Sequence, residues 1–146
     1  DAAAAITRLV DMGVEPFLIS SAVILILAQR LARKVCMECR EPIKVHPQLL
    51  MDLGVSPDEV KNFPVYRGKG CSICNGTGYK GRVGLYEVMP MKEELKELVL
   101  ARVSTTEIKK EAIRLGMKTL RHSGIMKVKE GVTTIEEILR TTMDDR

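Results

Sequence analysis

The sequence predicts a mixed α/β fold (α+β as a fragment), with a zinc-binding module between a short α/β segment and a helical tail. Three observations predict it. The first is a pair of C-x2-C motifs, Cys36–Cys39 and Cys71–Cys74, whose spacing is typical of a structural zinc site. The second is the apolar, β-branched run that begins at Val23, which indicates a strand. The third is a series of helix-capping signals after Pro90.

The composition is that of an ordinary globular chain. Hydrophobic residues make up 45% of the 146 residues and charged residues 29%, which excludes a disordered tail. Aromatic residues make up only 3% and Trp is absent, so base stacking is disfavoured and we expect no nucleic-acid partner. The formal charge of +4 falls to about +2 when four thiolates bind Zn²⁺, which is too little to predict binding to DNA or an acidic membrane.

The sequence predicts neither a transmembrane segment nor a signal peptide. The longest apolar run, residues 17–28, is interrupted by Ser20 and Ser21 and is shorter than the roughly 18–20 residues that a spanning helix needs. The chain opens on Asp1 and an alanine run rather than on a basic segment. We therefore expect a cytoplasmic protein, in which a reducing compartment favours zinc-bound cysteines over disulfides.

The first 35 residues predict two helices and a strand. Four alanines and the apolar spacing that follows them predict a helix that ends at Gly13. Pro16 stands at the first position of a second, short helix. From Val23 to Val35 an apolar run gives way to alternation, which predicts a strand buried at its start and increasingly solvent-exposed toward its end. A helix that continues through Arg33 is the alternative.

The two cysteine pairs are 31 residues apart and predict one zinc ion bound by Cys36, Cys39, Cys71 and Cys74. Two residues between cysteines let one tight turn direct two sulfur atoms at a common point, and the second pair completes a tetrahedron. Four protein ligands leave no position for water, so we expect a structural rather than a catalytic site. Two disulfides, a redox C-x-x-C pair, and iron in place of zinc are the alternatives.

The part of the chain after the cysteines predicts one strand and a helical tail. Residues 82–89 are typical of a strand. After Pro90, the segments Ser104-Thr105-Thr106-Glu107 and Thr133-Thr134-Ile135-Glu136 are capping boxes, each of which predicts the start of a helix. We expect three or four short helices in this tail to form a small C-terminal bundle.

Six segments of the sequence occur in the order found in one protein family. They are Ile6-Thr7-Arg8-Leu9, Gly13-Val14-Glu15-Pro16-Phe17, Ala28-Gln29-Arg30-Leu31-Ala32-Arg33, the four cysteines, Gly81-Arg82-Val83-Gly84-Leu85-Tyr86-Glu87 and Gly131-Val132-Thr133-Thr134-Ile135-Glu136-Glu137. Together they resemble the C-terminal part of the motor ATPases that assemble type IV pili or drive type II secretion, the PilB and GspE group. Each segment alone is a weak signal, whereas six in this order are specific.

The resemblance implies a division of the chain into three parts. Residues 1–35 would be the C-terminal end of a RecA-like ATPase domain, residues 36–90 a tetracysteine zinc-binding subdomain, and residues 91–146 a C-terminal helical subdomain. In that family the whole protein is a cytoplasmic homohexamer, peripheral to the inner membrane, that uses ATP and Mg²⁺. Its expected partner is the inner-membrane platform protein of the pilus or secretion machine. This region would have a structural and coupling role.

Gln29, Arg30 and Arg33 are candidates for contacts near a nucleotide or a subunit boundary, because they lie toward the outgoing end of the predicted strand. A guanidinium, which is always charged, is suited to phosphate contact there. A structural salt bridge with a neighbouring acid is the alternative. The sequence has no G-x-x-x-x-G-K-[ST] loop to hold phosphates, so we expect no catalytic residue and no ATP hydrolysis in this chain alone.

A second resemblance is local. Residues 71–78 are similar to the C-x-x-C-x-G-x-G repeat of the DnaJ chaperone zinc region, which makes a DnaJ-like chaperone module or a non-motor zinc adaptor the alternative function. The first cysteine pair lacks the glycines of that repeat.

Because residues 36–74 contain few large apolar side chains, we expect them to unfold without metal. We expect the helices after Pro90 to keep much of their structure.

Overall fold

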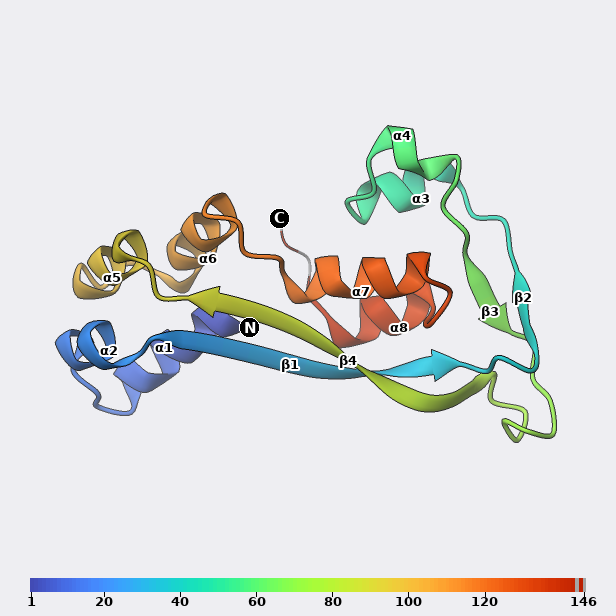
Figure 1. Cartoon of the computed structure of the whole chain (residues 1–146), viewed down its shortest axis with the longest axis horizontal. Coiled ribbons are helices and arrows are strands. Elements are labelled where there is room, and N and C mark those ends of the chain that lie inside the picture. Colours follow the sequence, from blue (N-terminus) through green and yellow to red (C-terminus); the bar gives the residue numbers. More distant parts are fainter. Residues whose placement is uncertain (144, 146) are drawn as a thin grey trace. The chain divides into compact units, whose positions relative to one another are not determined.

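The computed structural model describes residues 1–143 and 145, and it contains both helices and strands (Figure 1). In chain order the elements are α1 (Ala2–Asp11), α2 (Pro16–Ala22), β1 (Leu25–Val35), β2 (Arg40–Pro42), α3 (Pro47–Asp52), α4 (Pro57–Val60), β3 (Tyr66–Gly68), β4 (Tyr79–Pro90), α5 (Glu93–Leu100), α6 (Thr105–Arg114), α7 (Leu120–Lys129) and α8 (Ile135–Thr141). Within the described part of the chain, every helix is too short or too polar to cross a membrane. The predicted mixed α/β class is confirmed.

The N-terminal elements follow the local signals in the sequence. α1 ends two residues before Gly13, whose φ of +95° closes the helix. α2 begins with Pro16, where the missing N–H costs no hydrogen bond. β1 confirms the predicted strand, and the alternative of a helix through Arg33 is wrong.

The burial of β1 is the reverse of the predicted gradient. Leu25 and Leu27, at its start, are 49% and 55% exposed, whereas Ala32 and Val35, near its end, are 0% and 1% exposed. Large apolar side chains at the start therefore lie on an open face. Hydrophobicity indicates that a residue can be buried, but the element that packs on it decides whether it is.

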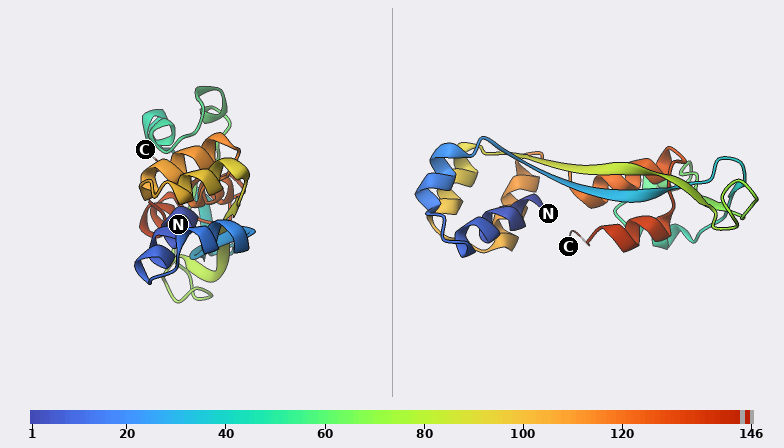
Figure 2. Two further views of the ribbon diagram at one scale, coloured as in Figure 1. Left: turned by 90° about the vertical axis from the view of Figure 1, so that its left-hand side faces the viewer. Right: turned by 90° about the horizontal axis from the view of Figure 1, so that it is seen from below.

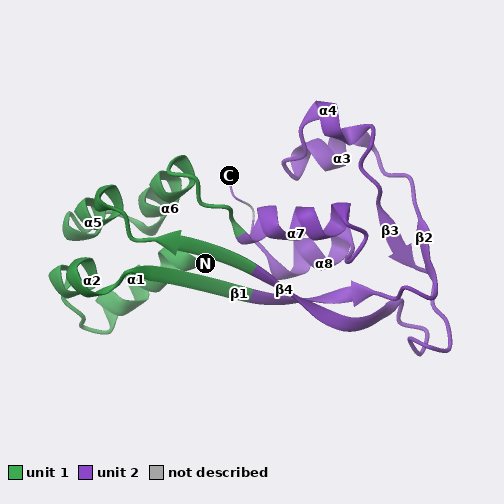
Figure 3. Cartoon of the chain, in the orientation of Figure 1, with its two compact units in different colours: residues 1–29, 86–119 green, residues 30–85, 120–146 purple. Residues whose placement is uncertain are grey.

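The chain folds into two compact units, each built from two separate stretches (Figure 3). Unit 1 consists of Asp1–Gln29 and Tyr86–Thr119, and unit 2 of Arg30–Leu85 and Leu120–Arg146. β1 and β4 pair in a two-stranded sheet, and each strand contributes residues to both units. A single C-terminal bundle is not confirmed, because α5 and α6 belong to unit 1 whereas α7 and α8 belong to unit 2.

Unit 1 contains four helices and the adjoining parts of β1 and β4, which share one core. α2 packs on α5, and α6 packs on both α1 and α5 (Figure 2). The buried residues of this core are Ala2, Ala3, Ile6, Ile19, Met89, Met91, Leu95, Val99, Ile108, Ala112 and Met117. Two carboxylates hold the first turn of α1: Asp1 accepts the N–H of Ala4 at 2.8 Å, and the buried Glu87 accepts the N–H of Ala2 at 2.7 Å. The positive end of a helix favours both.

Unit 2 combines a small two-stranded sheet, β2 with β3, with two pairs of helices. β2 and β3 are antiparallel, with Arg40 opposite Gly68. α3 packs on α4, and α7 packs on α8. Gly124 of α7 lets α8 approach closely, since a Cβ at this position would lie 2.7 Å from Cδ1 of Ile138. This close crossing buries Ile138 completely.

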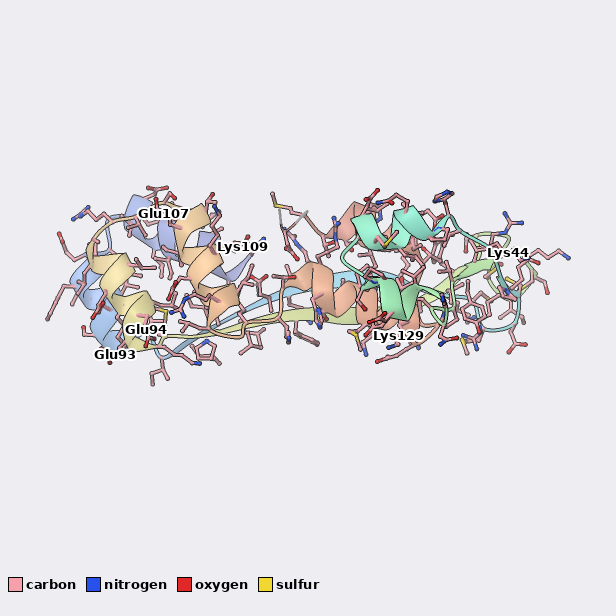
Figure 4. All side chains as sticks on the ribbon, turned by 90° about the horizontal axis from the view of Figure 1, so that it is seen from above. Lys44, Glu93, Glu94, Glu107, Lys109 and Lys129 are labelled. Carbon is pink, nitrogen blue, oxygen red and sulfur yellow. The ribbon has the colours of Figure 1, made fainter. Side chains whose placement is uncertain are left out.

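Charged residues at two helix ends match the helix dipole. The first turn of α5 carries Glu93 and Glu94, and the last turn of α7 carries Lys129 (Figure 4). Negative charge at a helix N-terminus and positive charge at a C-terminus each stabilise a helix by roughly 0.3–1 kcal/mol.

The two predicted capping boxes differ in outcome. Ser104 caps α6 as predicted, because its side chain accepts the N–H of Glu107 at 3.3 Å. α8 begins one residue later than predicted, since Thr134 rather than Thr133 accepts the N–H of Glu137, at 3.2 Å. The Oγ1 of Thr133 donates elsewhere, to a carbonyl of β1. A Thr-Thr pair offers two alternative caps, and tertiary contacts select one.

Candidate metal centre

The four cysteines lie beside the ends of four strands. Cys36 directly follows β1, Cys39 directly precedes β2, Cys71 follows β3, and Cys74 precedes β4. Their four Sγ atoms all lie within 4.8 Å of one another. Cys36 and Cys74 are buried, and the other two are partly buried. The fold therefore brings together residues that are up to 38 positions apart.

The Sγ separations fit a tetrahedral zinc ion. They are 3.8 Å between Cys36 and Cys71, 3.8 Å between Cys39 and Cys74, and 3.7 Å between Cys71 and Cys74. A regular tetrahedron with Zn–S bonds of about 2.3 Å has edges of about 3.8 Å. Disulfides need sulfur atoms about 2.05 Å apart, so all four residues are free thiols. The cluster fits one zinc ion with four protein ligands and no place for a substrate, which is the arrangement of a structural site.

Backbone N–H groups point at two of the sulfur atoms. Gly70 donates to Sγ of Cys39 at 3.3 Å, and Cys71 and Gly78 donate to Sγ of Cys74 at 3.3 and 3.2 Å. Hydrogen bonds to a thiolate stabilise its negative charge and fix its direction. All three donors lie in the segment around the second cysteine pair, which therefore orients one sulfur atom of each pair.

The thiols of this cluster differ in acidity. Burial raises the pKa of the Cys39 thiol to about 12, and the N–H of Gly70 offsets only part of this effect. Burial also acts to raise the pKa of Cys74, but the N–H groups of Cys71 and Gly78 outweigh it and lower that pKa to about 6. A coordinated divalent cation deprotonates a thiol outright. A bound zinc ion would thus supply the positive charge that a cluster of four thiolates requires.

Two glycines bring the strands together beside the sulfur atoms. A Cβ at Gly68 would clash with the backbone of Gly78, although Gly68 has an ordinary φ, so space rather than backbone conformation requires glycine here. The carbonyl of Gly78 accepts the N–H of Cys36 at 2.9 Å. This contact between two glycines that are ten positions apart has no local signal in the sequence.

The structure gives partners to two of the three residues proposed for nucleotide contact. Nε2 of Gln29 donates to Oη of Tyr86 at 3.1 Å, and Arg30 is exposed. Nη2 of Arg33 lies 2.9 Å from Oε1 of Glu137. Arg33 therefore makes the salt bridge that was the alternative to phosphate contact. Nucleotide contact by Gln29, Arg30 and Arg33 stays a prediction.

Glu137 is a residue of this region that the sequence did not single out. Its side chain is 1% exposed and accepts hydrogen bonds from both Arg33 and Arg140. Donors on Arg140 are the main cause of a pKa lowered to about 2, the donors on Arg33 add to it, and burial opposes both. From the sequence, Glu136 and Glu137 read alike as acids in the first turn of a helix. Arg140 lies three positions after Glu137 and four positions after Glu136, so the sequence pairs it with either acid.

Comparison with known proteins identifies the family. The model of the family "Type II/IV secretion system protein" matches residues 1–140. The chain belongs to this family. The resemblance to the PilB and GspE group is thereby confirmed, and a match of this extent favours membership of this family over the DnaJ-like and adaptor alternatives.

Three relatives show how much of a family member the chain represents. The type IV pilus assembly ATPase PilB of Myxococcus xanthus is 50% identical over 147 residues, which are 100% of this chain and 26% of that protein. PilB of Thermus thermophilus is 49% identical over 144 residues, 99% of this chain and 16% of that protein. The type II secretion system protein E of Pseudomonas aeruginosa is 42% identical over 141 residues, 97% of this chain and 28% of that protein. The chain thus spans 16–28% of the length of these relatives.

Proposed function

We propose that the chain is the zinc-stabilised C-terminal part of a hexameric ATPase that powers type IV pilus extension or type II protein secretion. Relatives that match nearly the whole chain are named as type IV pilus assembly ATPases or as a type II secretion system protein. The cysteine cluster fits a structural zinc ion, and the sequence has no phosphate-binding loop. The role of this part is therefore to support and couple the motor, with the chemistry of ATP hydrolysis elsewhere in the protein.

One observation in unit 1 carries this proposal: the paired strands have an open apolar face. Leu25 and Leu27 of β1 are half-exposed, and so are Tyr86 and Val88 of β4. The hydrogen bond from Gln29 to Tyr86 places these alternating side chains on one face. Two strands alone are marginally stable, and an exposed apolar patch marks a surface that another element covers. We propose that the rest of a RecA-like domain covers this face.

The proposed whole protein has the three-part order expected from the family. Residues 1–35 end the RecA-like domain, residues 36–90 form the zinc-binding subdomain, and residues 91–146 form the helical subdomain. The protein acts as a cytoplasmic homohexamer at the inner membrane, with ATP and Mg²⁺ held by residues outside this chain. The zinc-binding and helical parts present a surface to the inner-membrane platform protein.

Three side chains near the end of the RecA-like part are proposed to lie near the nucleotide or a subunit boundary. Arg30 is exposed and is the residue of the three best suited to reach a phosphate. Gln29 and Arg33 have the partners described above, which hold them in place. We expect their substitution to alter the position of Arg30 rather than to remove a direct contact.

A chimera tests the proposal. In the Myxococcus xanthus relative, the segment that matches this chain is replaced by residues 1–146. We expect the purified chimera to bind one zinc ion per subunit, to assemble into hexamers and to hydrolyse ATP, and the strain to extend pili. Cys71→Ser should abolish assembly or pilus extension while nucleotide binding is retained. Ser72→Ala, inside the same cysteine turn, is the matched control.

The outcome that refutes the proposal is equally specific. A chimera that folds and binds zinc, yet neither assembles nor hydrolyses ATP, would show that this chain cannot serve as the C-terminal part of such a motor. A Cys71→Ser chimera that extends pili as well as the Ser72→Ala chimera would refute the structural role of the zinc.

A further inference from the structure

Residues Gly131–Glu137, called the clasp segment here, run from the end of α7 into the first turn of α8. They contact the strand that leads into the first cysteine pair. The N–H of Val35 donates to the carbonyl of Val132 at 2.9 Å, and Oγ1 of Thr133 donates to the carbonyl of Arg33 at 2.8 Å. Val35 and Thr133 are fully buried, and Val35 directly precedes Cys36. The clasp segment therefore binds the chain immediately before a metal ligand.

The clasp segment also contacts the strand that leaves the first cysteine pair. Arg40, which directly follows Cys39, donates from Nη1 to the carbonyl of Gly131 at 2.8 Å. The same guanidinium lies over the ring of Tyr66 in β3, 4.4 Å from its centroid. A Cβ at Gly131 would clash with this guanidinium. Arg40 therefore lies against the backbone of the clasp segment, supported by the strand that leads to the second cysteine pair.

The strand after the second cysteine pair makes a third contact. Oη of Tyr79 in β4 lies 2.7 Å from Oγ1 of Thr134, the residue that caps α8. The guanidinium of Arg33 lies 4.1 Å from the centroid of the Tyr79 ring. Glu137 accepts the backbone N–H of Arg33 at 2.7 Å and its Nε at 3.0 Å. The start of α8 is therefore fixed from both β1 and β4.

We propose that the clasp segment is an outer part of the metal site, so that zinc binding and the folding of α7 and α8 form one cooperative event. Zinc fixes the ends of the four strands relative to one another, and the contacts to the clasp segment come from these same strands. Without metal a module of this size has too little core to keep the strand ends in place. Outer contacts of this kind orient the ligands of a metal and tune its affinity.

The coupling is reciprocal, which makes it measurable from either side. If zinc stabilises α8 through the clasp segment, then the clasp segment must strengthen zinc binding by the same factor.

The inference rests on zinc occupancy of the cluster, which is part of the proposed function. Elemental analysis of the purified chain therefore comes first, because a chain without zinc refutes the metal site itself, whereas the later steps address the coupling alone.

Hydrogen exchange of the zinc-loaded chain, with and without a chelator, tests the coupling directly. We expect amides of α7 and α8 to lose protection together with residues 36–74 when zinc is removed. The helices α1 and α6 of unit 1 are the internal control and should stay protected. If α7 and α8 stay as protected as before, the inference is wrong. It is also wrong if α1 and α6 lose protection equally, since the effect would then belong to the whole chain.

A pair of neighbouring glutamates tests the reciprocal effect. Glu137→Gln removes the buried charge that holds Arg33. We expect the zinc affinity to decrease by a factor of ~5–150, which is the range typical of coupled sites. Affinity is measured by competition with a chromophoric chelator. Glu136→Gln changes the exposed acid next to it and should leave the affinity unchanged. Equal affinities in the two variants overturn the inference.

A glycine pair provides an independent variant should Glu137→Gln not fold. Gly131→Ala places a methyl group against Arg40 at a position whose φ is +77°. Gly116→Ala strains the backbone in the same way, with a φ of +105°, but its methyl group would meet no described atom within 4 Å, and it lies in unit 1. Weaker zinc binding in the Gly131 variant alone supports the coupling. Equal zinc affinities in the two variants refute it.

Discussion

Replacing Glu137 by glutamine removes a buried negative charge while keeping the shape of the side chain. The carboxylate oxygens of Glu137 accept hydrogen bonds from Nε and Nη2 of Arg140 at 2.9 and 3.0 Å. They also accept the backbone N–H and the Nε of Arg33 at 2.7 and 3.0 Å. A glutamine has one acceptor oxygen and an NH₂ group that would face these donors. Arg33 and Arg140 would both lose the negative charge with which they form ion pairs.

The magnitude follows from the pKa of this carboxyl. Arg140 and Arg33 lower it from 4.5 to about 2, against the opposing effect of burial. At about 1.36 kcal/mol for each pKa unit, the ionised carboxylate stabilises unit 2 by about 3 kcal/mol. Because the pKa is lowered in the folded state, this stabilisation is fully present above a pH of about 4.5 and is lost as the pH falls toward 2.

Urea unfolding of the zinc-saturated chain, followed by far-UV circular dichroism, measures the effect. At pH 7 we expect the free energy of unfolding of Glu137→Gln to be about 3 kcal/mol below that of the wild type. Glu136→Gln should lower it by no more than about 1 kcal/mol, since its exposed side chain loses only its interaction with the N-terminus of α8. The difference at position 137 should stay constant between pH 7 and pH 5.

Two results would refute this reasoning. Equal unfolding midpoints for the Glu136 and Glu137 variants at pH 7 would mean that the buried ion pair contributes no net stability. A difference that already shrinks between pH 7 and pH 6 would mean that the pKa of Glu137 is raised by burial rather than lowered by its arginine donors.

Three further predictions concern the metal centre and the activity of the chain. Elemental analysis should find one zinc ion per chain, lost in Cys71→Ser but not in Ser72→Ala; two ions, or a mass showing disulfides, would contradict this. Gly68→Ala should abolish zinc binding because its methyl group meets the backbone of Gly78, whereas Gly54→Ala, which strains only its own backbone (φ +101°) and has open space around it, should still bind zinc in the same assay. The isolated chain should show no ATP turnover above background in a phosphate-release assay, and turnover lost on mutation of this chain would prove the prediction wrong.

Signals that act within a few residues predicted their structures correctly. Gly13 ends α1, Pro16 begins α2 and Ser104 caps α6, because each acts through its own backbone or side chain on the next turn. The C-x2-C spacing is a signal of the same kind. One turn directs two sulfur atoms, and two such turns suffice to define a tetrahedron.

Features that depend on packing between distant segments could not be predicted in the same way. The start of β1 is apolar but open, since Leu25 and Leu27 stay 49% and 55% exposed and lie outside the core cluster of the described residues. Glu137 is buried although its neighbour Glu136 is exposed, because β1 supplies donors at one of the two positions. No local pattern in the sequence distinguishes these two glutamates before the partner strand is known.

The helices after Pro90 show why capping signals do not predict which segments fold together. A cap stabilises a helix by about 1 kcal/mol, and isolated helices shorter than roughly 12–15 residues are marginal in water. α6 has 10 residues and α8 has 7, so packing rather than capping must decide their stability. α6 packs on α1 in unit 1, whereas α8 packs on α7 and is held by the strands that lead to and from the cysteines. From the sequence, all the helices after Pro90 were expected to keep much of their structure without the metal. The packing restricts this expectation to α5 and α6, whereas α7 and α8 should unfold when the zinc is removed.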